Sequence, residues 1–383
     1  MTRDRLGAIA GVAESDLGVV GPLRTTLDLQ AQAAKLALED AGLELKDVDA
    51  VFSAGGDAWS PTMAIAEYLG ITPGWSDSTN LGGSSFDAHV GHAVTAMRAG
   101  RCQVALITYG STQRSQRSRS LGGHGGIRGP AQFELIWGLP LPVGAYALAA
   151  TRHMHQYGTT AEQLAEVAVS TRAWAALNPK AFYRDPITIE DVLASPVISS
   201  PLHLLDCCLV TDGGGAVVVV SEAVAASIRK QPVWVIGHAE AHTHLTIANM
   251  PDLTVTPAAL SGPVAMDMAG VTHSDLDVVE LYDSFTITVI ETLESLGFCA
   301  PGEGGAFVSG GRTAPGGEFP LNTNGGGLSY CHPGMYGIFL LIEAARQLRG
   351  ERGEAQVAEA RLALVNGTGG VLSSCATVVL AGG

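Results

Sequence analysis

Along this chain, short apolar runs take turns with longer stretches in which alanine and large apolar residues mix with polar ones. The runs at 104–109, 216–220 and 363–365 are the clearest of the first kind. A short run without polar alternation indicates a strand that is covered on both faces, because a half-exposed strand would alternate apolar and polar residues. The longer stretches are typical of helices. This succession predicts a layered α/β protein.

A long internal repeat divides the chain into two related halves. Residues 37–51 and 265–279 share alanine, glycine, aspartate and valine at a constant offset. In each copy a helix with small residues ends at a glycine suited to a C-terminal cap, and an Asp-containing turn leads into an apolar strand. A second match pairs TNLGGSS at 79–85 with TNGGGLS at 323–329. Since the two matches keep their order, we attribute them to duplication.

The repeat predicts where the chain divides. We expect an N-terminal half at 1–225 and a C-terminal half at 226–383, joined near 221–233. Residues from about 111 to 201 have no counterpart in the second half and contain several helical patterns with Gly/Pro loops. We expect this segment to be a loop insertion over the first half.

Composition excludes several classes of function. A net charge of −15 argues against a nucleic-acid or anionic-membrane partner, because phosphate binding needs a basic face. No apolar run of about 18 residues predicts a transmembrane helix, and no signal peptide is visible. The six cysteines include no CxxC pair, so we expect no zinc site in this chain. We expect a reduced, cytoplasmic protein of two packed domains.

Five segments together resemble the thiolase superfamily over nearly the whole chain. They are GGSS at 82–85 with the helix that follows, LDCCLVTDGGGA at 205–216, ELYDSFT at 280–286, NGGG with CHP at 324–333, and NGTGG at 366–370. In thiolases the corresponding segments carry the nucleophile loop, the end of the first half, an Asn-Glu-x-Phe-Ala type motif, the Gly-His-Pro motif and the last catalytic loop. The resemblance implies an α/β thiolase fold of two homologous βαβαβαββ halves in a five-layer αβαβα arrangement.

The departures from the thiolase pattern concern the two catalytic cysteines. The nucleophile position falls at Gly83 or Ser84, and no cysteine lies nearby. Asn366 stands near the loop where thiolases place a second, acid/base cysteine. Both cysteine roles are therefore lost. Serine is a poor nucleophile unless a base activates it.

Phenols stand close in the sequence to the surviving His-Pro motif. The His or Asn of the second-half motif is Tyr282 here, and two further tyrosines flank His332, namely Tyr330 and Tyr336. This pattern resembles a subgroup of thiolase-like lipid-transfer proteins, the steroid side-chain-cleaving aldolases.

The subgroup resemblance implies retro-aldol cleavage of a β-hydroxyacyl-CoA thioester. In the steroid case a tertiary alcohol at the ring gives a ketone and a short acyl-CoA such as propionyl-CoA. The resemblance also implies a homodimer and a small partner protein with an OB fold and a zinc ribbon that binds acyl-CoA, in an α2β2 complex. Zinc is expected only in that partner, and this chain is expected to hold neither a metal nor a cofactor.

Retro-aldol cleavage needs a base for the β-hydroxyl and a group that stabilises the thioester enolate. A tyrosine, with an ordinary pKa of about 10, needs a nearby cation or donor to act as the base. His332 and glycine-loop amides are suited to hold the enolate, and a second tyrosine would return the proton. The candidate catalytic residues are Tyr282, His332, Tyr330 and Tyr336. The candidate substrate contacts are Gly83, Ser84, Asn324, Gly326, Asn366 and Gly369.

Two other functions stay open at this point: a thiolase-like acyltransferase that uses Ser84, and a non-catalytic subunit that binds acyl-CoA or lipid. Asp283 has two interpretations, one that orients Tyr282 and one that caps a helix. The basic cluster at 114–119 could meet CoA phosphates, but a solvated loop or subunit contact is favoured. For His89, His92 and Cys375 we favour buried structural roles over metal binding or nucleophilic attack.

Overall fold

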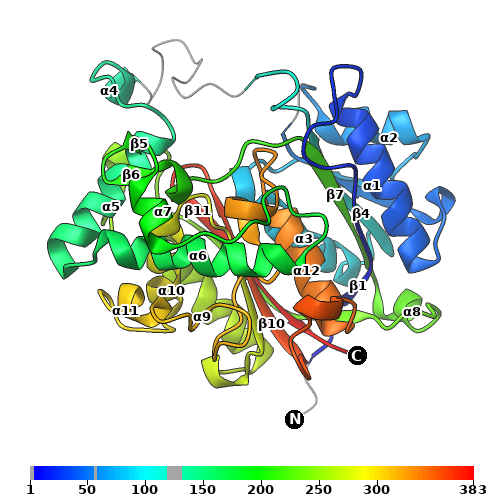
Figure 1. The fold of residues 1–383 in the computed structure, drawn as a ribbon. Helices are drawn as coiled ribbons and strands as arrows, with labels where there is room; N and C mark the ends of the chain where they lie inside the picture. The colour runs from blue at the N-terminus through cyan, green and yellow to red at the C-terminus, as the bar shows by residue number, and fades with distance from the viewer. Residues whose placement is uncertain (1–3, 56–57, 119–131) are drawn as a thin grey trace.

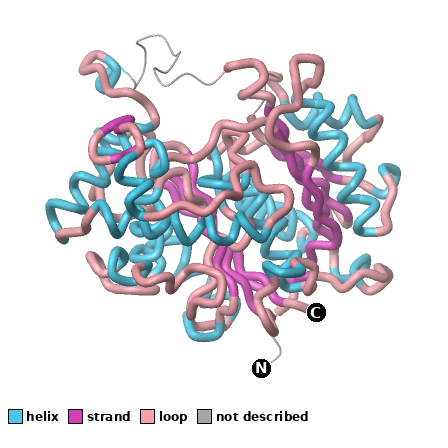
Figure 2. Tube along the Cα trace, in the orientation of Figure 1, coloured by secondary structure: helices cyan, strands magenta, loops and turns pink. Residues whose placement is uncertain are grey.

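The computed structural model describes residues 4–55, 58–118 and 132–383. Its main feature is a nine-stranded sheet in the order β3-β2-β4-β7-β1-β8-β11-β10-β9, of which the first five strands come from the first half of the chain and the last four from the second. The two groups of strands meet where β1 pairs antiparallel with β8. Figure 2 shows the strands as two bands with helices between them.

The strands of the first half are mixed in direction. Running inward from the edge, β3 (Trp75–Asp77) lies parallel to β2 (Ala50–Phe52), and β2 lies parallel to β4 (Val104–Ser111). Antiparallel pairs then join β4 to β7 (Gly213–Val220) and β7 to β1 (Gly7–Glu14).

The strands of the second half follow the same order outward from the centre of the sheet, with β8, β11, β10 and β9 equivalent to β1, β7, β4 and β2. β8 (Val233–His242) pairs antiparallel with β11 (Ser374–Ala381), β11 pairs antiparallel with β10 (Leu362–Gly369), and β10 lies parallel to β9 (Val278–Leu281). The strand equivalent to β3 is reduced to one parallel bridge, between Val279 and Leu321. The chain passes from one half-sheet to the other through α8 (Glu222–Ala225).

Two pairs of helices cover the outer faces. α1 (Thr26–Ala41) packs on β1, β4 and β7, with α2 (Pro61–Leu69) beside it. The equivalent α9 (Ala258–Ala269) packs on β8 and β11, with α10 (Thr286–Leu296) beside it. Both α1 and α9 end at the left-handed glycines that the repeat predicted as caps.

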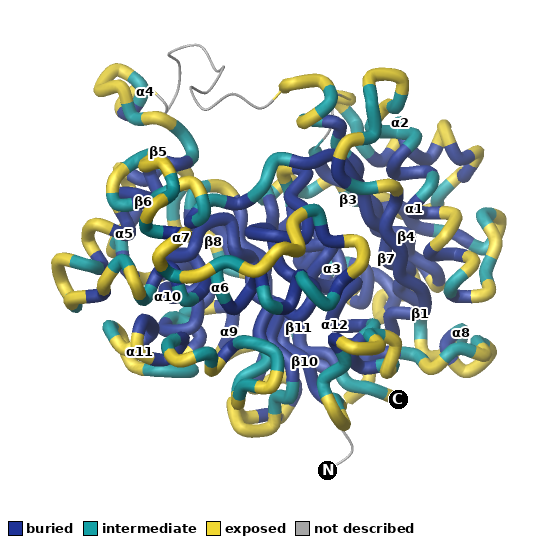
Figure 3. Tube along the Cα trace, in the orientation of Figure 1, coloured by how far each residue is buried: buried dark blue, intermediate teal, exposed yellow. Residues whose placement is uncertain are grey.

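Two central helices lie between the half-sheets and complete the five layers (Figure 1). α3 (Ser85–Arg98) and α12 (Gly337–Leu348) each contact strands of both halves, and they contact each other. Figure 3 shows both in the buried interior. Most residues of both helices are buried. The predicted thiolase-type layering is confirmed.

The segment between β4 and β7 forms most of the first half's extra structure. Its described elements are α4 (Gln132–Leu135), α5 (Val143–Tyr157), α6 (Ala161–Leu177), α7 (Ile189–Ala194), β5 (Val197–Ser199) and β6 (Leu202–His203). The second half has α11 (Gly304–Val308) after α10, and β10 reaches β11 through a short turn. In the described part of the chain, no helix is both long enough and apolar enough to cross a membrane.

Candidate active site

Two loops of the second half bring a phenol and an imidazole together. Tyr282 directly follows β9, and its N–H donates to the carbonyl of Asn366 at 3.0 Å, which continues the pairing of β9 with β10. His332 follows a π-helical turn at Gly326–Tyr330, called the glycine turn below. The His332 N–H donates to Thr211 Oγ1 at 3.0 Å. Both loops are therefore fixed by backbone hydrogen bonds.

The Tyr282 hydroxyl lies 2.8 Å from Nε2 of His332. Their rings meet edge to face, with centroids 5.6 Å apart, and both side chains are buried. The same hydroxyl lies 3.3 Å from the carbonyl of Gly334. The predicted proximity of the two residues is therefore present, and at this distance one proton can be shared between oxygen and nitrogen.

Gly83 stands against the ring of Tyr282. A Cβ atom at position 83 would lie 2.1 Å from Cε2 of Tyr282 and 2.5 Å from the carbonyl oxygen of Thr368. Neither distance is compatible with a side chain. The ring of Tyr282 thus fills the room that a nucleophile at position 83 would need.

A cavity of about 340 Å³ opens at the Tyr282–His332 pair. Four of the predicted site residues line it: Gly83, Tyr282, His332 and Gly369. The other lining residues are Gly82, Gln113, Pro142, Tyr146, Cys208, Ser284, Phe285, Gly334, Met335, Thr368 and Gly370. The volume is within the range of small-molecule sites.

A second cavity of about 360 Å³ adjoins the first, and four residues line both: Gln113, Pro142, Cys208 and Phe285. Its walls are otherwise mostly apolar, and it also touches Arg114 and Arg117. Arg114 is anchored, because its Nη1 donates to the Val210 carbonyl at 2.8 Å. Two residues of the basic cluster thus border the second cavity, whereas Arg119 lies outside the described residues.

The hydroxyls of Tyr330 and Tyr336 do not reach the cavity, contrary to the prediction of catalytic roles. Tyr330 donates to Glu14 at 2.8 Å, and that carboxylate also binds Arg346. Tyr336 stacks beside His332 with ring centroids 6.2 Å apart, but its hydroxyl donates to Asn324 at 2.8 Å. Burial raises the pKa of both phenols well above the ordinary value. Both are packed, neutral side chains.

Four predicted substrate contacts also lie away from the cavity walls. The Ser84 hydroxyl is buried 2.8 Å from that of Ser374. Asn366 donates to Thr377 at 2.7 Å, and Asn324 accepts from the N–H of Gly326 at 2.8 Å. These hydrogen bonds hold loops together. The four residues therefore have a structural role in the loops, and they do not form the cavity wall as predicted.

Tyr146 is a cavity residue with an ionisable side chain that was not among the predicted site residues. It comes from α5, in the extra segment of the first half, and its ring packs on Phe285 with centroids 4.4 Å apart. Its hydroxyl lies 3.4 Å from the Gly370 carbonyl. Burial raises the pKa of Tyr146 to about 12. Only its place in the fold reveals it, because no family motif covers α5.

The histidines of α3 and Cys375 have structural surroundings. Burial lowers the pKa of His89 to about 4, and its Nε2 lies 3.0 Å from the Thr79 carbonyl. His92 lies between Asp77, at 2.6 Å, and Glu240, at 3.2 Å. Burial raises the pKa of Cys375 to about 12. Within the described ranges, no group of three or more histidine, cysteine, aspartate or glutamate residues could hold a metal ion.

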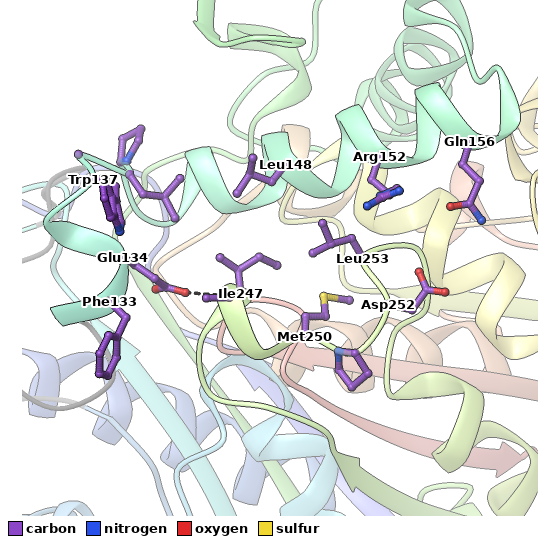
Figure 4. A pocket seen from close by; sticks show the side chains of 15 residues that line it. Phe133, Glu134, Trp137, Leu148, Arg152, Gln156, Ile247, Met250, Asp252 and Leu253 are labelled. Atoms are coloured by element: carbon purple, nitrogen blue, oxygen red, sulfur yellow. Dashed lines mark hydrogen bonds between the residues drawn. The ribbon is translucent and has the colours of Figure 1, made fainter.

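A larger hollow of about 790 Å³ lies on the outer side of α5 (Figure 4). It runs between Leu148, Arg152 and Gln156 of α5 and the segment around Met250, and Glu134 closes one end by accepting the Ala248 N–H at 2.9 Å. It shares no lining residue with the Tyr282–His332 cavity. It is therefore a separate feature of the surface.

Comparisons with known proteins agree with this architecture. Residues 239–382 match the family model described as thiolase C-terminal domain-like. The chain is 37% identical over 358 residues to the steroid side-chain-cleaving aldolase of Thermomonospora curvata, covering 90% of each protein. It is 36% identical to the 17-hydroxy-3-oxo-4-pregnene-20-carboxyl-CoA lyase of Mycobacterium tuberculosis, covering 90% of this chain and 91% of that protein. The solved structure of an Ltp2-ChsH2(DUF35) aldolase matches with a TM-score of 0.89 and 33% identity, covering 98% of this chain and 97% of that chain.

The likeness extends over both halves and over the loops that build the cavity. It confirms the family predicted from the five motifs, together with the subgroup indicated by the lost cysteines. The chain belongs to the thiolase superfamily, in the group of the steroid side-chain-cleaving aldolases.

Proposed function

We propose that this chain cleaves the bond between the α- and β-carbons of a β-hydroxyacyl-CoA thioester by a retro-aldol reaction. The observation that carries the proposal is the 2.8 Å contact between Tyr282 and His332 at a cavity. The ring of Tyr282 occupies the room of the thiolase nucleophile, at Gly83. The site therefore favours proton transfer over covalent attachment.

The first half of the reaction is a proton relay. Tyr282 takes the proton of the β-hydroxyl while it passes its own proton to Nε2 of His332, so no free tyrosinate is needed. The electron pair of the broken C–C bond moves into the thioester as an enolate, and the β-carbon becomes a ketone. The imidazolium of His332 then stabilises the negative charge of the enolate.

In the second part of the reaction, a proton returns to the α-carbon of the enolate. Tyr146 is suited to this step, because its pKa of about 12 keeps the phenol protonated at neutral pH. Its hydroxyl borders the cavity and lies 3.4 Å from the Gly370 carbonyl. The proton on His332 then returns to Tyr146 by exchange with solvent, which restores both residues. The substrate's atoms are divided between the ketone and a short acyl-CoA, and no water is consumed. Tyr146 thus takes the role of the second tyrosine, which the sequence left open among Tyr282, Tyr330 and Tyr336.

The substrate we propose is a steroid whose side chain carries a tertiary hydroxyl, with propionyl-CoA as a product. Its support is the names of two relatives, a steroid side-chain-cleaving aldolase and a 17-hydroxy-steroid carboxyl-CoA lyase. We propose that the thioester arm runs through the second cavity, where the apolar walls suit its carbon chain. Arg114 and Arg117 would then meet phosphates of CoA.

We further propose a homodimer that binds an acyl-CoA-binding partner with an OB fold and a zinc ribbon, in an α2β2 complex. The name of the similar Ltp2-ChsH2(DUF35) aldolase supports a protein partner. The dimer is supported by β3, a partly exposed strand at the sheet edge, because such edges are normally covered.

The acyltransferase alternative is the less supported one. Its nucleophile would be Ser84, whose hydroxyl contacts Ser374 at 2.8 Å and donates to the Leu81 carbonyl at 3.2 Å. A buried hydroxyl with these contacts, away from the cavity, is poorly placed to attack a thioester. The non-catalytic alternative gives no reason for a buried tyrosine–histidine contact at a cavity.

Activity assays of matched variants test the proposal. The chain, alone and with a co-expressed DUF35-type partner, is given a 17-hydroxysteroid side-chain CoA thioester, and the ketone is identified by mass spectrometry. Tyr282→Phe and His332→Ala should each lower kcat by roughly 10²- to 10³-fold. If the unaltered protein cleaves the substrate and neither change slows it, the site assignment fails.

A further inference from the structure

Asp283 is fully buried next to Tyr282, yet it does not line the cavity. Its two carboxyl oxygens accept backbone hydrogen bonds from the glycine turn. Oδ1 accepts the N–H of Gly327 at 2.6 Å, and Oδ2 accepts the N–H of Leu328 at 3.1 Å. In its ionised form the carboxylate makes charge-assisted bonds, which are stronger than neutral ones. One side chain thus joins the end of β9 to the turn that precedes His332.

The glycine turn wraps closely around this carboxyl group. A Cβ atom at Gly326, whose φ is +60°, would lie 2.0 Å from Oδ2 of Asp283. At Gly327 a Cβ atom would lie 3.1 Å from Oδ1 and 3.1 Å from Cδ2 of His332. The carboxyl group, the turn and the imidazole ring are therefore packed without spare room.

The turn is also connected to the segment that fixes His332. The carbonyl of Gly327 accepts the N–H of Leu209 at 2.9 Å, and Thr211, two residues further on, binds the backbone of His332. The N–H of Cys208 in turn donates to the carbonyl of Ser284 at 3.0 Å. A displacement of the turn would therefore be passed to the backbone on both sides of the site.

We propose that Asp283 is a positioning residue whose carboxylate holds the glycine turn and thereby sets the distance between Tyr282 and His332. This role rests on the proposed function of that pair, and it makes Asp283 necessary for the proton relay without contact to the substrate. The sequence suggested two roles for Asp283, one that orients Tyr282 and one that caps a helix. In this proposal the carboxylate caps the glycine turn, and this contact orients the Tyr282–His332 pair.

The test replaces Asp283 by asparagine, which keeps the size but exchanges one acceptor oxygen for an NH₂ group that cannot accept. The misplaced relay should lower kcat by ~100-fold, while KM changes by less than about threefold because the cavity walls stay in place. The matched control is Glu291→Gln, a fully buried carboxylate on α10 that does not line the cavity. The control should keep kcat within about twofold.

A crystal structure of the Asp283→Asn variant supplies a readout that does not depend on activity. The distance from Tyr282 Oη to His332 Nε2 should exceed 3.5 Å. An unchanged distance together with an unchanged kcat would overturn the proposal, as would a loss of stability with the distance and kcat retained. If the unaltered protein cleaves no β-hydroxyacyl-CoA, the proposed function fails, and the crystal distance alone then decides the positioning role.

A second variant covers the case in which Asp283→Asn does not fold. Gly327→Ala places a methyl group against both Asp283 Oδ1 and His332 Cδ2. It should lengthen the same Oη–Nε2 distance and lower kcat by ~10-fold or more, again with little change in KM. Retention of both the distance and kcat in Gly327→Ala would contradict the proposal.

Discussion

The two halves carry matching glycine-rich loops, 79–85 and 323–329, that lie at the centre of the molecule and have different tasks. The first loop leads into α3. It has no side chain at Gly83, and the ring of Tyr282 occupies the space where one would lie. The second leads through the glycine turn to His332. One loop therefore provides space, and the other positions a reactive group.

This difference teaches where the chemistry of the site resides. Tyr282, His332 and Asp283 all belong to the second half, while the first half supplies Gly83 and the cavity wall from α5. The first loop has no side chain at position 83, and this leaves the room that the ring of Tyr282 occupies. The comparison predicts that refilling this room damages the site more than removing a hydroxyl from it.

Gly83→Cys should have the largest effect, because it puts back the residue type of a thiolase nucleophile where the Tyr282 ring now stands. The Cβ atom would lie 2.1 Å from that ring, so the phenol must move. We expect aldol cleavage to fall by at least ~10³-fold, since both the position and the proton transfer are lost. Product formation by mass spectrometry measures it.

Gly74→Ala is the matched control, since a Cβ there would meet only the Asp49 carbonyl, at 3.8 Å. It should retain nearly full activity. Comparable activity in Gly83→Cys would show that the ring is not confined by position 83, which contradicts the comparison of the two loops.

A series of tyrosine-to-phenylalanine changes separates the catalytic phenol from the packed ones. Tyr282→Phe should lower kcat by ~10²- to 10³-fold, because its hydroxyl lies 2.8 Å from Nε2 of His332. Tyr336→Phe and Tyr330→Phe should lower it by less than about tenfold, since their hydroxyls bond to Asn324 and Glu14. Steady-state kinetics decide the order. A larger loss in Tyr330→Phe than in Tyr282→Phe would reverse the assignment.

The pH dependence of stability should reveal the buried carboxyl group of Asp283. Burial raises its pKa to about 7, and the hydrogen bonds from the glycine turn only partly oppose this shift. Because the folded-state pKa lies above the unfolded-state value of about 3.9, the folded state binds the extra proton between these values, and stability falls as the pH rises through that window.

Urea unfolding at pH 5 and pH 6.5 measures this effect as a difference between proteins. The unaltered protein should lose roughly 2 kcal/mol more than Asp283→Asn over this interval, at about 1.4 kcal/mol per pH unit. An identical pH dependence in both proteins would mean that Asp283 ionises in the folded protein at its ordinary pKa.

Ser84→Ala should have the smallest effect on activity. The hydroxyl bonds to Ser374 and to the Leu81 carbonyl, so its removal should cost about 1 kcal/mol of stability and leave kcat within about twofold. Thermal unfolding and steady-state kinetics check both values. A loss of activity beyond 100-fold would instead favour the acyltransferase, in which this serine attacks the thioester.

The sequence predicted the parts of the fold that repeat. Both glycine caps follow from the matching segments. The layered order of strands and helices in the two halves was implied by the resemblance to the thiolase superfamily. The equivalent of β3 in the second half was not foreseen as a single bridge at Leu321. Pairing at a sheet edge depends on tertiary contacts, and local sequence does not determine those.

The candidate site was also predicted only in part. Tyr282 and His332 each stand in a family motif, and their contact follows from where those motifs lie in the fold. The direction of Tyr330 did not follow, because its partner Glu14 is 316 residues away in the chain. Tyr146 was missed for a related reason, since α5 reaches the cavity only through tertiary packing. Side-chain direction and long-range partners are the information that spacing does not contain.

A single-turnover reaction in D₂O tests the central claim, that the C–C bond breaks without a bond between protein and substrate. The enzyme is mixed with a 17-hydroxysteroid side-chain CoA thioester, and products and intact protein are followed by mass spectrometry. We predict that ketone and short acyl-CoA appear at the same rate, with one deuterium on the α-carbon and no change in protein mass. A short acyl-CoA that appears later than the ketone, while the protein gains the mass of an acyl group, would contradict the account.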